Sequence, residues 1–488
     1  MKPEQFPGDL RPHLIPKPEG DLVYRCLECG AEYDISQLLY TCPKCQGLFL
    51  LEDRAADRLS QKPGAFWRRL FDYRKMLNIP ALKGIHLFYE LITPVIPLED
   101  LIYLGEGHTP QVAANANLQG EVGAAFYFKN DGQNPSASFK DRGMAAALSY
   151  LNYLARRPGA GKLLAICAST GDTSAAAALY AAYLGDKVAS AVLLPQGKVT
   201  PQQLAQPLGS GAQVLEIPGV FDDCMKVVEA LADHYQVALL NSKNPWRIRG
   251  QESYAFEVAQ WFDYDLAGKV VVVPIGNAGN ITAIVQGFLR LHDLKIIETL
   301  PRIIGVQSRH ADPVFRYYLE PDPARRVFTP VTVAPSVAQA AMIGNPVSMP
   351  RVIRLVEEYH RRAGEGSVAV VQVSEQEIMD SMLLANRHGH IACTQGGESL
   401  AGFRAALKEG VIFSGEVGVL DATAHHLKFI GFQQRYFDNS FPPEFEVTPK
   451  PEYQNRPLLL TPRTGDPEKQ TADLAGQIAA LLGLSPKK

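Results

Sequence analysis

Residues 134–143 read NPSASFKDRG, and a helix-like stretch, GMAAAL, continues from Gly143. Polar and turn-forming residues lead to a single lysine, Lys140, just before the expected start of that helix. The unpaired N–H groups of a helix start carry partial positive charge, which favours the neutral form of a nearby amine. A neutral amine can attack a carbonyl carbon and form a Schiff base. A solvated lysine at a helix start fits the pattern equally well, so Lys140 needs support from elsewhere in the chain.

The composition is that of a globular protein without a large excess of charge. The chain has 488 residues, of which 46% are hydrophobic and 20% charged, and its formal net charge is −3. This length predicts two or three domains. Without a basic excess we expect no nucleic-acid or membrane partner, so an anionic ligand needs a local site. Residues 1–8 lack an apolar leader pattern and the apolar run 175–184 is too short to cross a bilayer, so we expect a cytoplasmic protein.

Short apolar runs alternate with helical stretches over most of the chain. Residues 163–167, 189–194 and 269–273 have the pattern of buried strands, and residues 223–235 and 253–262 that of helices. This alternation predicts an α/β fold of doubly wound βαβ units, with parallel sheets covered on both faces. Because ligands of such sheets bind beyond the carboxyl ends of the strands, the loops after these runs are where we expect the chemistry.

Two loops that follow strand runs have the residues of anion sites. Residues 168–174 read ASTGDTS, and hydroxyl groups with a glycine at a helix start can hold an anion. Plain N-capping is the simpler explanation, although it needs fewer hydroxyl groups than this loop offers. Residues 274–281 read PIGNAGNI, and glycines allow the backbone to close around a ligand with its N–H groups turned to phosphate oxygens. A tight strand-to-helix turn would have the same pattern.

Two cysteine pairs near the N-terminus have the spacing of a metal site. Cys26 and Cys29 form one C-x-x-C pair, which Gly30 follows, and Cys42 and Cys45 form another. Two such pairs joined by a short segment are typical of a four-cysteine zinc ribbon. We expect structural zinc here, since the neighbouring residues are acidic and make no basic stripe for nucleic acid. A reduced remnant of a ribbon and a redox dithiol are the alternatives.

Taken together, these motifs resemble the pyridoxal-phosphate enzymes of the tryptophan synthase β-subunit fold, and most closely the threonine synthases among them. The likeness begins with the lysine motif at 136–143 and the glycine loop at 276–280. It spans residues 24–428 and includes further stretches at 168–174 (ASTGDTS), 241–251 (NSKNPWRIRGQ), 343–348 (IGNPVS) and 423–428 (TAHHLK).

The resemblance implies two α/β domains of the fold-type II kind, preceded by the zinc ribbon and followed by an arm. The expected parts are residues 1–60 for the ribbon segment, 61–150 for the lead and first part of the cofactor domain, 151–245 for a smaller α/β domain, 246–438 for the larger cofactor-binding domain and 439–488 for a C-terminal arm.

The resemblance also implies how pyridoxal phosphate would be held. Lys140 would form the Schiff base and move protons. Thr423 would bond the pyridine nitrogen, where a neutral hydroxyl group leaves that nitrogen largely unprotonated. Asp172 would face the ring oxygen, at a place where some members of the family have Asn and other threonine synthases have Asp. The other expected cofactor contacts are Phe139 beside the ring and the phosphate-binding residues Gly276, Asn277, Ala278, Gly279 and Asn280.

The substrate that the resemblance implies is O-phosphohomoserine, which needs a second phosphate site. Arg247 is the first candidate for it, because a planar guanidinium binds phosphate through two N–H groups. Arg249 stands where many relatives have Glu. The other residues that match the family's substrate site are Ser169, Thr170, Thr173, Asn241 and Ser242.

The implied reaction removes phosphate from the γ-carbon and adds water at the β-carbon, which yields L-threonine, with Lys140 as the acid and base at the α-carbon. One alternative is an enzyme of the same fold that acts on O-phosphoserine by β-replacement or on threonine as a dehydratase. Another is a regulatory module that binds the cofactor without catalysis. The segment from Asn241 to Arg247 favours a phosphorylated substrate over free threonine. The family likeness further implies a homodimer.

Overall fold

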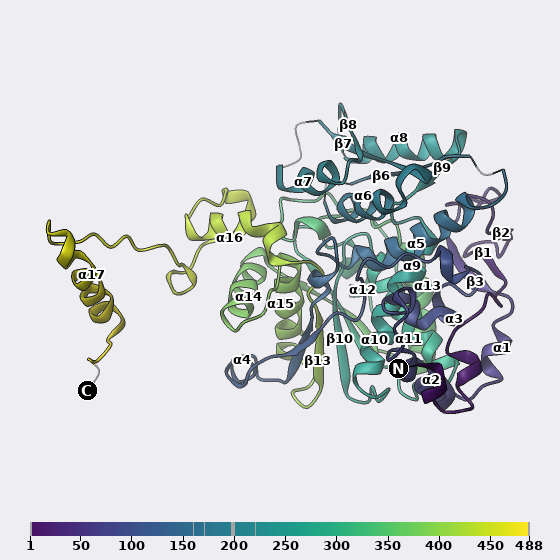
Figure 1. Ribbon diagram of the computed structural model, residues 1–488, viewed down its shortest axis with the longest axis horizontal. Helices are drawn as coiled ribbons and strands as arrows, with labels where there is room; N and C mark the ends of the chain where they lie inside the picture. Colours follow the sequence, from purple (N-terminus) through teal and green to yellow (C-terminus); the bar gives the residue numbers. More distant parts are fainter. Residues whose placement is uncertain (1, 160, 170, 197–200, 220, 487–488) are drawn as a thin grey trace.

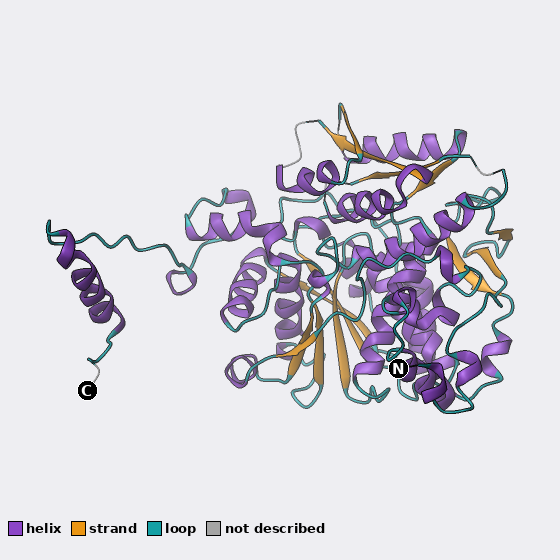
Figure 2. Ribbon diagram, in the orientation of Figure 1, coloured by secondary structure: helices purple, strands orange, loops and turns teal. Residues whose placement is uncertain are grey.

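Two sheets made largely of parallel strands organise the chain (Figures 1 and 2). The computed structural model describes residues 2–159, 161–169, 171–196, 201–219 and 221–486. In Figure 1 the smaller sheet lies above the larger one, and a third, short sheet lies at the right-hand edge. The site described below lies where the two larger sheets face each other.

The larger sheet has the strand order β12–β11–β10–β13–β5–β4. Its strands are parallel except for β4, which runs antiparallel to β5 at the edge. The strands are β4 (Gln111–Ala113), β5 (Phe126–Lys129), β10 (Lys269–Pro274), β11 (Arg302–Ser308), β12 (Val368–Val373) and β13 (Val417–Asp421).

Successive side chains of β10 enter two different cores. Val271 and Val273 join the core that contains residues of α11 (Gly279–Asp293) and α13 (Met349–Ala363). Val270 and Val272 join the core formed with α14 (Glu375–Arg387) and α15 (Thr394–Lys408). A strand buried on both faces needs apolar residues at every position. The continuous valine run thus predicted the covered parallel sheet correctly.

The smaller sheet has the order β8–β7–β6–β9, and all its strands are parallel. The strands are β6 (Leu163–Ala168), β7 (Val188–Pro195), β8 (Gln213–Ile217) and β9 (Val237–Leu239). Its connecting helices are α6 (Asp172–Leu184), α7 (Pro201–Gly209) and α8 (Phe221–His234). The strands predicted at 163–167 and 189–194 are both present.

The short third sheet has the order β2–β1–β3 and is antiparallel. Its strands are β1 (Leu22–Cys26), β2 (Glu32–Asp34) and β3 (Phe49–Asp53), and we call residues 22–53 the ribbon. The helices not yet named are α1 (Asp57–Ser60), α2 (Gly64–Arg74), α3 (Tyr89–Ile92), α4 (Ala116–Val122), α5 (Lys140–Ala155), α9 (Pro245–Gln251), α10 (Ser253–Trp261), α12 (Pro313–Leu319), α16 (Ile430–Phe437) and α17 (Pro467–Leu482).

The C-terminal segment leaves the body of the molecule. In Figure 1, α17 stands apart from every other helix, and it has no buried residue. In the part of the chain that the structure describes, no helix combines the length and the apolarity that a bilayer crossing needs. We keep the five-part division of the chain as a proposal, because the small sheet lies within 163–239 while the large sheet takes strands from both 111–129 and 269–421.

Candidate active site

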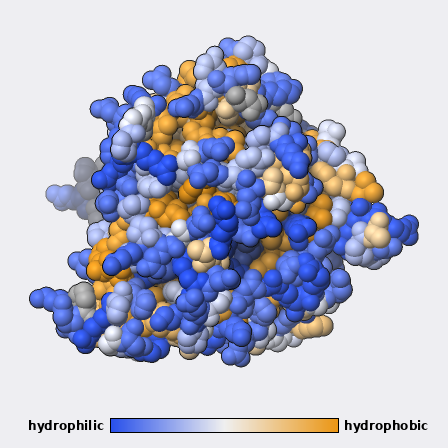
Figure 3. Space-filling model, turned by 90° about the vertical axis from the view of Figure 1, so that its right-hand side faces the viewer, coloured by the Kyte–Doolittle hydropathy of each residue, from blue (hydrophilic) through white to orange (hydrophobic). Residues whose placement is uncertain are grey.

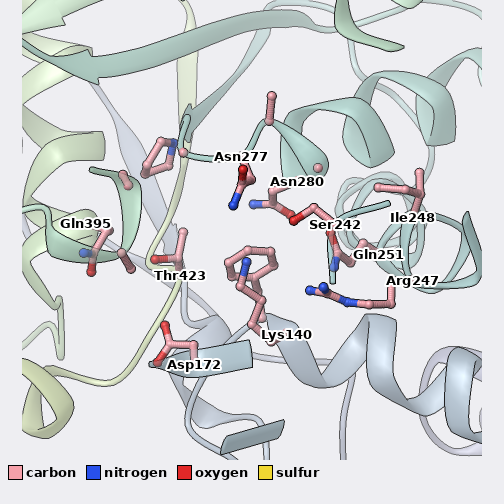
Figure 4. A pocket seen from close by; sticks show the side chains of 17 residues that line it. Lys140, Asp172, Ser242, Arg247, Ile248, Gln251, Asn277, Asn280, Gln395 and Thr423 are labelled. Atoms are coloured by element: carbon pink, nitrogen blue, oxygen red, sulfur yellow. The ribbon is translucent and has the colours of Figure 1, made fainter. Parts of the chain in front are cut away.

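The carboxyl ends of strands from both larger sheets surround one pocket. The loops after β10 and β13 contribute the glycine loop and Thr423, and the loops after β6 and β9 contribute Asp172 and Ser242. Lys140 occupies the middle of the pocket in Figure 4. The residues that line the pocket are Phe139, Lys140, Asp172, Ser242, Arg247, Ile248, Gln251, Pro274, Gly276, Asn277, Ala278, Gly279, Asn280, Ala340, Ala341, Gln395 and Thr423.

Lys140 lies in surroundings that favour its neutral amine. Burial, followed by the positive charges of Arg247 and Lys428, lowers the pKa of Lys140 to about 7 from 10.5, although Asp172 acts in the opposite direction. Its Nζ lies 4.2 Å from the centre of the Phe139 ring. The sequence predicted this neutral tendency from the helix start, and α5 does begin at Lys140. The largest cause, however, is the burial that the pocket imposes.

Close packing between α5 and α9 sets Lys140 beside Arg247. A Cβ atom on Gly250 would lie 2.3 Å from the carbonyl oxygen of Arg142, and one on Gly143 would lie 2.9 Å from that of Arg247. Neither distance leaves room for a side chain. The two glycines therefore allow the lysine helix and the arginine helix to touch through their backbones.

A buried ionic network stabilises the first turn of α5. Arg142 is fully buried and pairs with Asp131 at 2.7 Å and with Glu257 at 2.5 Å. Lys129, at the end of β5, pairs with the same glutamate at 2.7 Å. Positive charge from Arg142 and Lys129 holds the pKa of Glu257 well below its usual range, even though burial acts against it. Such a network fixes the helix start on which Lys140 sits.

The glycine loop forms a cradle at the start of α11. Its left-handed residue is Ala278, with φ 61°, and not one of the glycines. Gly276 is required for a different reason, because a Cβ atom there would come within 3.0 Å of Ala341. Ser348 donates its N–H to the carbonyl oxygen of Asn277 at 3.1 Å, and Asn280 donates to Asp421 at 2.7 Å. The free N–H groups at this helix start can hold an anion.

Thr423 and Gln395 lie on the same side of the pocket (Figure 4). The backbone carbonyl of Thr423 accepts a hydrogen bond from Phe139 at 2.8 Å, which joins β13 to the lysine loop. Gln395 is 2% exposed, and neither atom of its amide has a hydrogen-bond partner among the described residues. A buried amide without a partner is costly. It therefore points to a ligand in the pocket. No motif in the sequence indicated Gln395.

Asp172 has a cationic partner that the sequence interpretation did not assign. Lys428 Nζ lies 2.7 Å from Asp172 Oδ1 and donates to the carbonyl oxygen of Ser136 at 3.0 Å. Asp172 starts α6 in the smaller domain, whereas Lys428 follows β13 in the larger one. The pair therefore joins the two domains at the edge of the pocket. Lys428 is part of the TAHHLK motif, so the sequence analysis singled out its segment, but no pattern identified Asp172 as its partner.

Arg247 and Ser242 lie on the opposite side of Lys140 (Figure 4). Arg247 is 2% exposed, donates to the carbonyl oxygen of Leu240 at 2.9 Å, and has its Nε without a partner among the described residues. Burial lowers its pKa to about 10, which still leaves a cation at neutral pH. A buried guanidinium with a free N–H is suited to a phosphate ligand.

Several predicted substrate residues lie outside the lining. Asn241 uses its amide on the backbone of Ala168, accepting from the N–H at 3.0 Å and donating to the carbonyl at 2.7 Å. Ser169 accepts from the N–H of Gly171 at 3.2 Å. Thr173 is on the first turn of α6 and does not line the pocket in this structure. Thr170 lies outside the described residues.

The four cysteines of the ribbon converge on one point. Their Sγ atoms all lie within 4.8 Å of one another. Cys26 and Cys45 are 3.4 Å apart, and Cys29 and Cys42 are 3.6 Å apart. Each pair sits in a turn closed by a residue with positive φ, which is Gly30 after the first pair and Gln46 after the second. A tetrahedral ion with four sulfur ligands fits this arrangement.

Comparison with known proteins places the chain in a class. The model of the family described as "Pyridoxal-phosphate dependent enzyme" matches residues 102–419. A crystal structure of threonine synthase from Escherichia coli shares the fold, with a TM-score of 0.63 at 22% identity over 94% of this chain and all of that one. Fold and site together define a pyridoxal-phosphate-dependent enzyme, and the predicted fold class is confirmed.

Sequence relatives narrow the class further. The threonine synthase of Methanocaldococcus jannaschii is 34% identical over 83% of this chain and 93% of its own length. The chloroplastic threonine synthase 2 of Arabidopsis thaliana is 33% identical over 81% of this chain and 74% of its own length. The chain belongs to the threonine synthase family.

Proposed function

We propose that the protein converts O-phospho-L-homoserine and water into L-threonine and phosphate, as a lyase that uses pyridoxal phosphate. The observation that carries the proposal is the position of Lys140 between two sets of anion-binding groups. The cradle at 276–280 lies on one side of its amine and Arg247 with Ser242 on another (Figure 4). A phosphorylated cofactor and a phosphorylated substrate need two such sets.

The residues present fit pyridoxal phosphate. Lys140 would hold it covalently through its amine, and the N–H groups at the start of α11 would hold its phosphate. Thr423 would bond the ring nitrogen, and Phe139 would lie beside the ring. The amide of Gln395 would gain the partner that it lacks within the described chain. The bound cofactor supplies an electron sink for carbanions of the amino acid.

The protein's own groups would position the substrate and move its protons. Arg247 and Ser242 would bind the phosphate that leaves, and the site tolerates that dianion because the guanidinium is otherwise short of partners. Lys140, once its amine is free, would take and return the proton at the α-carbon. Asp172 would face the cofactor's ring oxygen with Lys428 behind it, so that the charge of its carboxylate is balanced.

We propose that the ribbon binds one zinc ion through Cys26, Cys29, Cys42 and Cys45. Zinc–sulfur bonds of about 2.3 Å in a tetrahedron place the sulfur atoms about 3.8 Å apart. The shorter sulfur distances in the ribbon, 3.4 and 3.6 Å, are close to that value. Metal analysis should find about one zinc per chain, and Cys26→Ser should lower that content sharply.

The function is tested by the products. Purified protein with O-phosphohomoserine should release phosphate and form threonine in equal amounts. Reduction with borohydride should attach the cofactor to Lys140, and Lys140→Ala should lose both the attachment and the activity. Lys408→Ala is a suitable comparison, because Lys408 is an exposed lysine of α15 that does not line the pocket. A keto acid as the main product, or turnover of O-phosphoserine alone, would overturn the proposal.

We propose a homodimer in the cytoplasm, where thiols stay reduced and can bind zinc. The exposed residues Ile478, Leu481 and Leu482 of α17 support a contact with another chain, since they share one face of the helix.

A further inference from the structure

Arg351 of α13 joins three segments that are far apart in the sequence. Its guanidinium donates to the carbonyl oxygen of Phe49 in the ribbon at 3.0 and 2.7 Å. It also donates to the carbonyl oxygens of Ser242 at 2.9 Å and Lys243 at 2.8 Å. A further bond reaches Ser348 Oγ at 3.1 Å. One side chain thus connects the ribbon with the segment that contributes Ser242 to the pocket.

The ribbon end of this connection lies next to the cysteine cluster. Phe49 is the cross-strand partner of Cys26 and is fully buried. Its ring lies 5.5 Å from that of Tyr24 and 5.6 Å from that of Tyr33, and the hydroxyl of Tyr33 lies 3.3 Å from Cys42 Sγ. Displacement of either cysteine would therefore shift the strand whose carbonyl Arg351 binds.

The pocket end lies next to the proposed phosphate site. The carbonyl groups of Ser242 and Lys243, which Arg351 binds, belong to the turn that leads into α9, the helix of Arg247. Ser348, its fourth partner, donates its backbone N–H to the carbonyl of Asn277 in the glycine cradle. Arg351 therefore contacts segments that adjoin both proposed anion sites, although it is not among the residues that line the pocket.

A second arginine makes a parallel connection. Arg249, on the same helix as Arg247, donates to the carbonyl oxygen of Leu51 in β3 at 3.2 Å and is 2% exposed. Glu, which the family resemblance implies at this position in many relatives, could not donate to that carbonyl when ionised. The departure from the family pattern thus has a partner in the ribbon.

The burial of Arg351 is costly and calls for a reason. The residue is 0% exposed, and burial lowers its pKa to about 9, with no nearby charge among the described residues to offset the effect. A buried cation whose partners are neutral groups contributes little net stability. Its planar, many-donor group does, however, hold several carbonyl oxygens at fixed positions, which Lys could not reproduce.

We infer that Arg351 is a positioning residue that connects the turn at Ser242–Lys243 to the zinc ribbon. Metal in the ribbon therefore determines how rigidly the residues of the phosphate site are held. The inference rests on the proposed phosphate and zinc sites. The ribbon lies on the side of the molecule that faces the viewer in Figure 3, where its cysteine turns are reachable from solvent. Arg351 is fully buried.

The test measures hydrogen exchange of residues 241–250 in the cofactor-loaded protein, before and after a chelator removes zinc, together with binding of inorganic phosphate. In the wild-type protein, metal removal should speed exchange about tenfold and weaken phosphate binding by a similar factor. In Arg351→Met, both changes should already be present with zinc bound, and the chelator should add less than about twofold. The Michaelis constant should rise while kcat changes little.

Arg354→Met is the matched control, because Arg354 lies on the same helix and is exposed; it should behave as the wild type does. If Arg351→Met does not fold, Arg351→Lys and the wild type still allow the test. Unchanged exchange at 241–250 after verified zinc loss would overturn the inference, as would a full chelator response in the Arg351 variants. If zinc removal changes exchange and phosphate binding as expected but the protein forms no threonine, the inference is supported and the proposed function is refuted.

Discussion

The proposed chemistry depends at the residue scale on the neutral amine of Lys140. Its surroundings lower the pKa of this amine to about 7 from 10.5, so the neutral form becomes the major one above that pH. We predict that the rate at which cofactor-free protein takes up pyridoxal phosphate rises about tenfold per pH unit below pH 7 and levels off above it. Stopped-flow absorbance would follow the uptake. A rate that still climbs steeply from pH 8 to 9.5 would indicate an ordinary lysine.

Asp172 and Lys428 form a pair in which each residue compensates the charge of the other. The Asp172 side chain is 4% exposed and that of Lys428 17%. We predict that Lys428→Met lowers the free energy of unfolding by about 2 kcal/mol and reduces kcat, because a nearly buried carboxylate loses its partner.

Adding Asp172→Asn to Lys428→Met should restore most of that loss, since the buried charge is then gone. Denaturant titrations of the single and double variants measure the coupling between the two positions. If the two losses simply add, the ion pair has no role beyond its separate residues.

Contact between two helices, α5 and α9, sets the geometry of the pocket at the element scale. A Cβ atom on Gly250 would lie 2.3 Å from the carbonyl oxygen of Arg142 and 2.8 Å from Ala146 Cβ. We predict that Gly250→Ala destabilises the protein by about 1–3 kcal/mol and lowers activity by moving Arg247 away from Lys140. Thermal unfolding and kcat/KM are the measurements.

Gly120→Ala is the control for that change. Gly120 is an exposed residue of α4, and a Cβ atom there would meet nothing within 4 Å. The substitution should leave stability unchanged or raise it slightly, because alanine favours a helix. A similar loss from both substitutions would mean that the effect of Gly250→Ala does not come from the contact between α5 and α9.

At the scale of the whole molecule, the chain consists of a catalytic body and a C-terminal arm. Hydrogen bonds that involve residues 461–488 among the described residues stay within that segment, and α17 buries no side chain. We predict that removal of residues 461–488 changes the melting temperature of the body by less than about 2 °C and leaves kcat intact. Light scattering of both forms measures their mass and tests the proposed dimer. A large drop in melting temperature without a change in mass would show that the arm packs on the body, whereas a lower mass would show that α17 contributes to the proposed dimer.

The sequence alone predicted the class of fold, which is confirmed, and it indicated Lys140 as the reactive residue, which stays a prediction. The valine run at 269–273 needs two apolar faces, so the local pattern was sufficient for the covered sheet. The glycine loop after it predicts an anion site at the end of the strand. The spacing of the paired cysteines likewise predicts a metal site, whereas the lysine motif became specific only together with the other motifs of the family resemblance.

Only the tertiary structure decided what surrounds those segments. Gln395, the pairing of Lys428 with Asp172, and the bonds of Arg351 to Phe49 and Ser242 join residues far apart in the chain, and no local pattern encodes such partners. Asn241 is the opposite case, since the sequence motif predicted it as a substrate residue. In the structure its amide bonds the backbone of Ala168 and does not line the pocket. The physical reason is that burial and charge act through space, so the pKa of Lys140 and the order of the anion sites arise only when both domains and the ribbon are assembled.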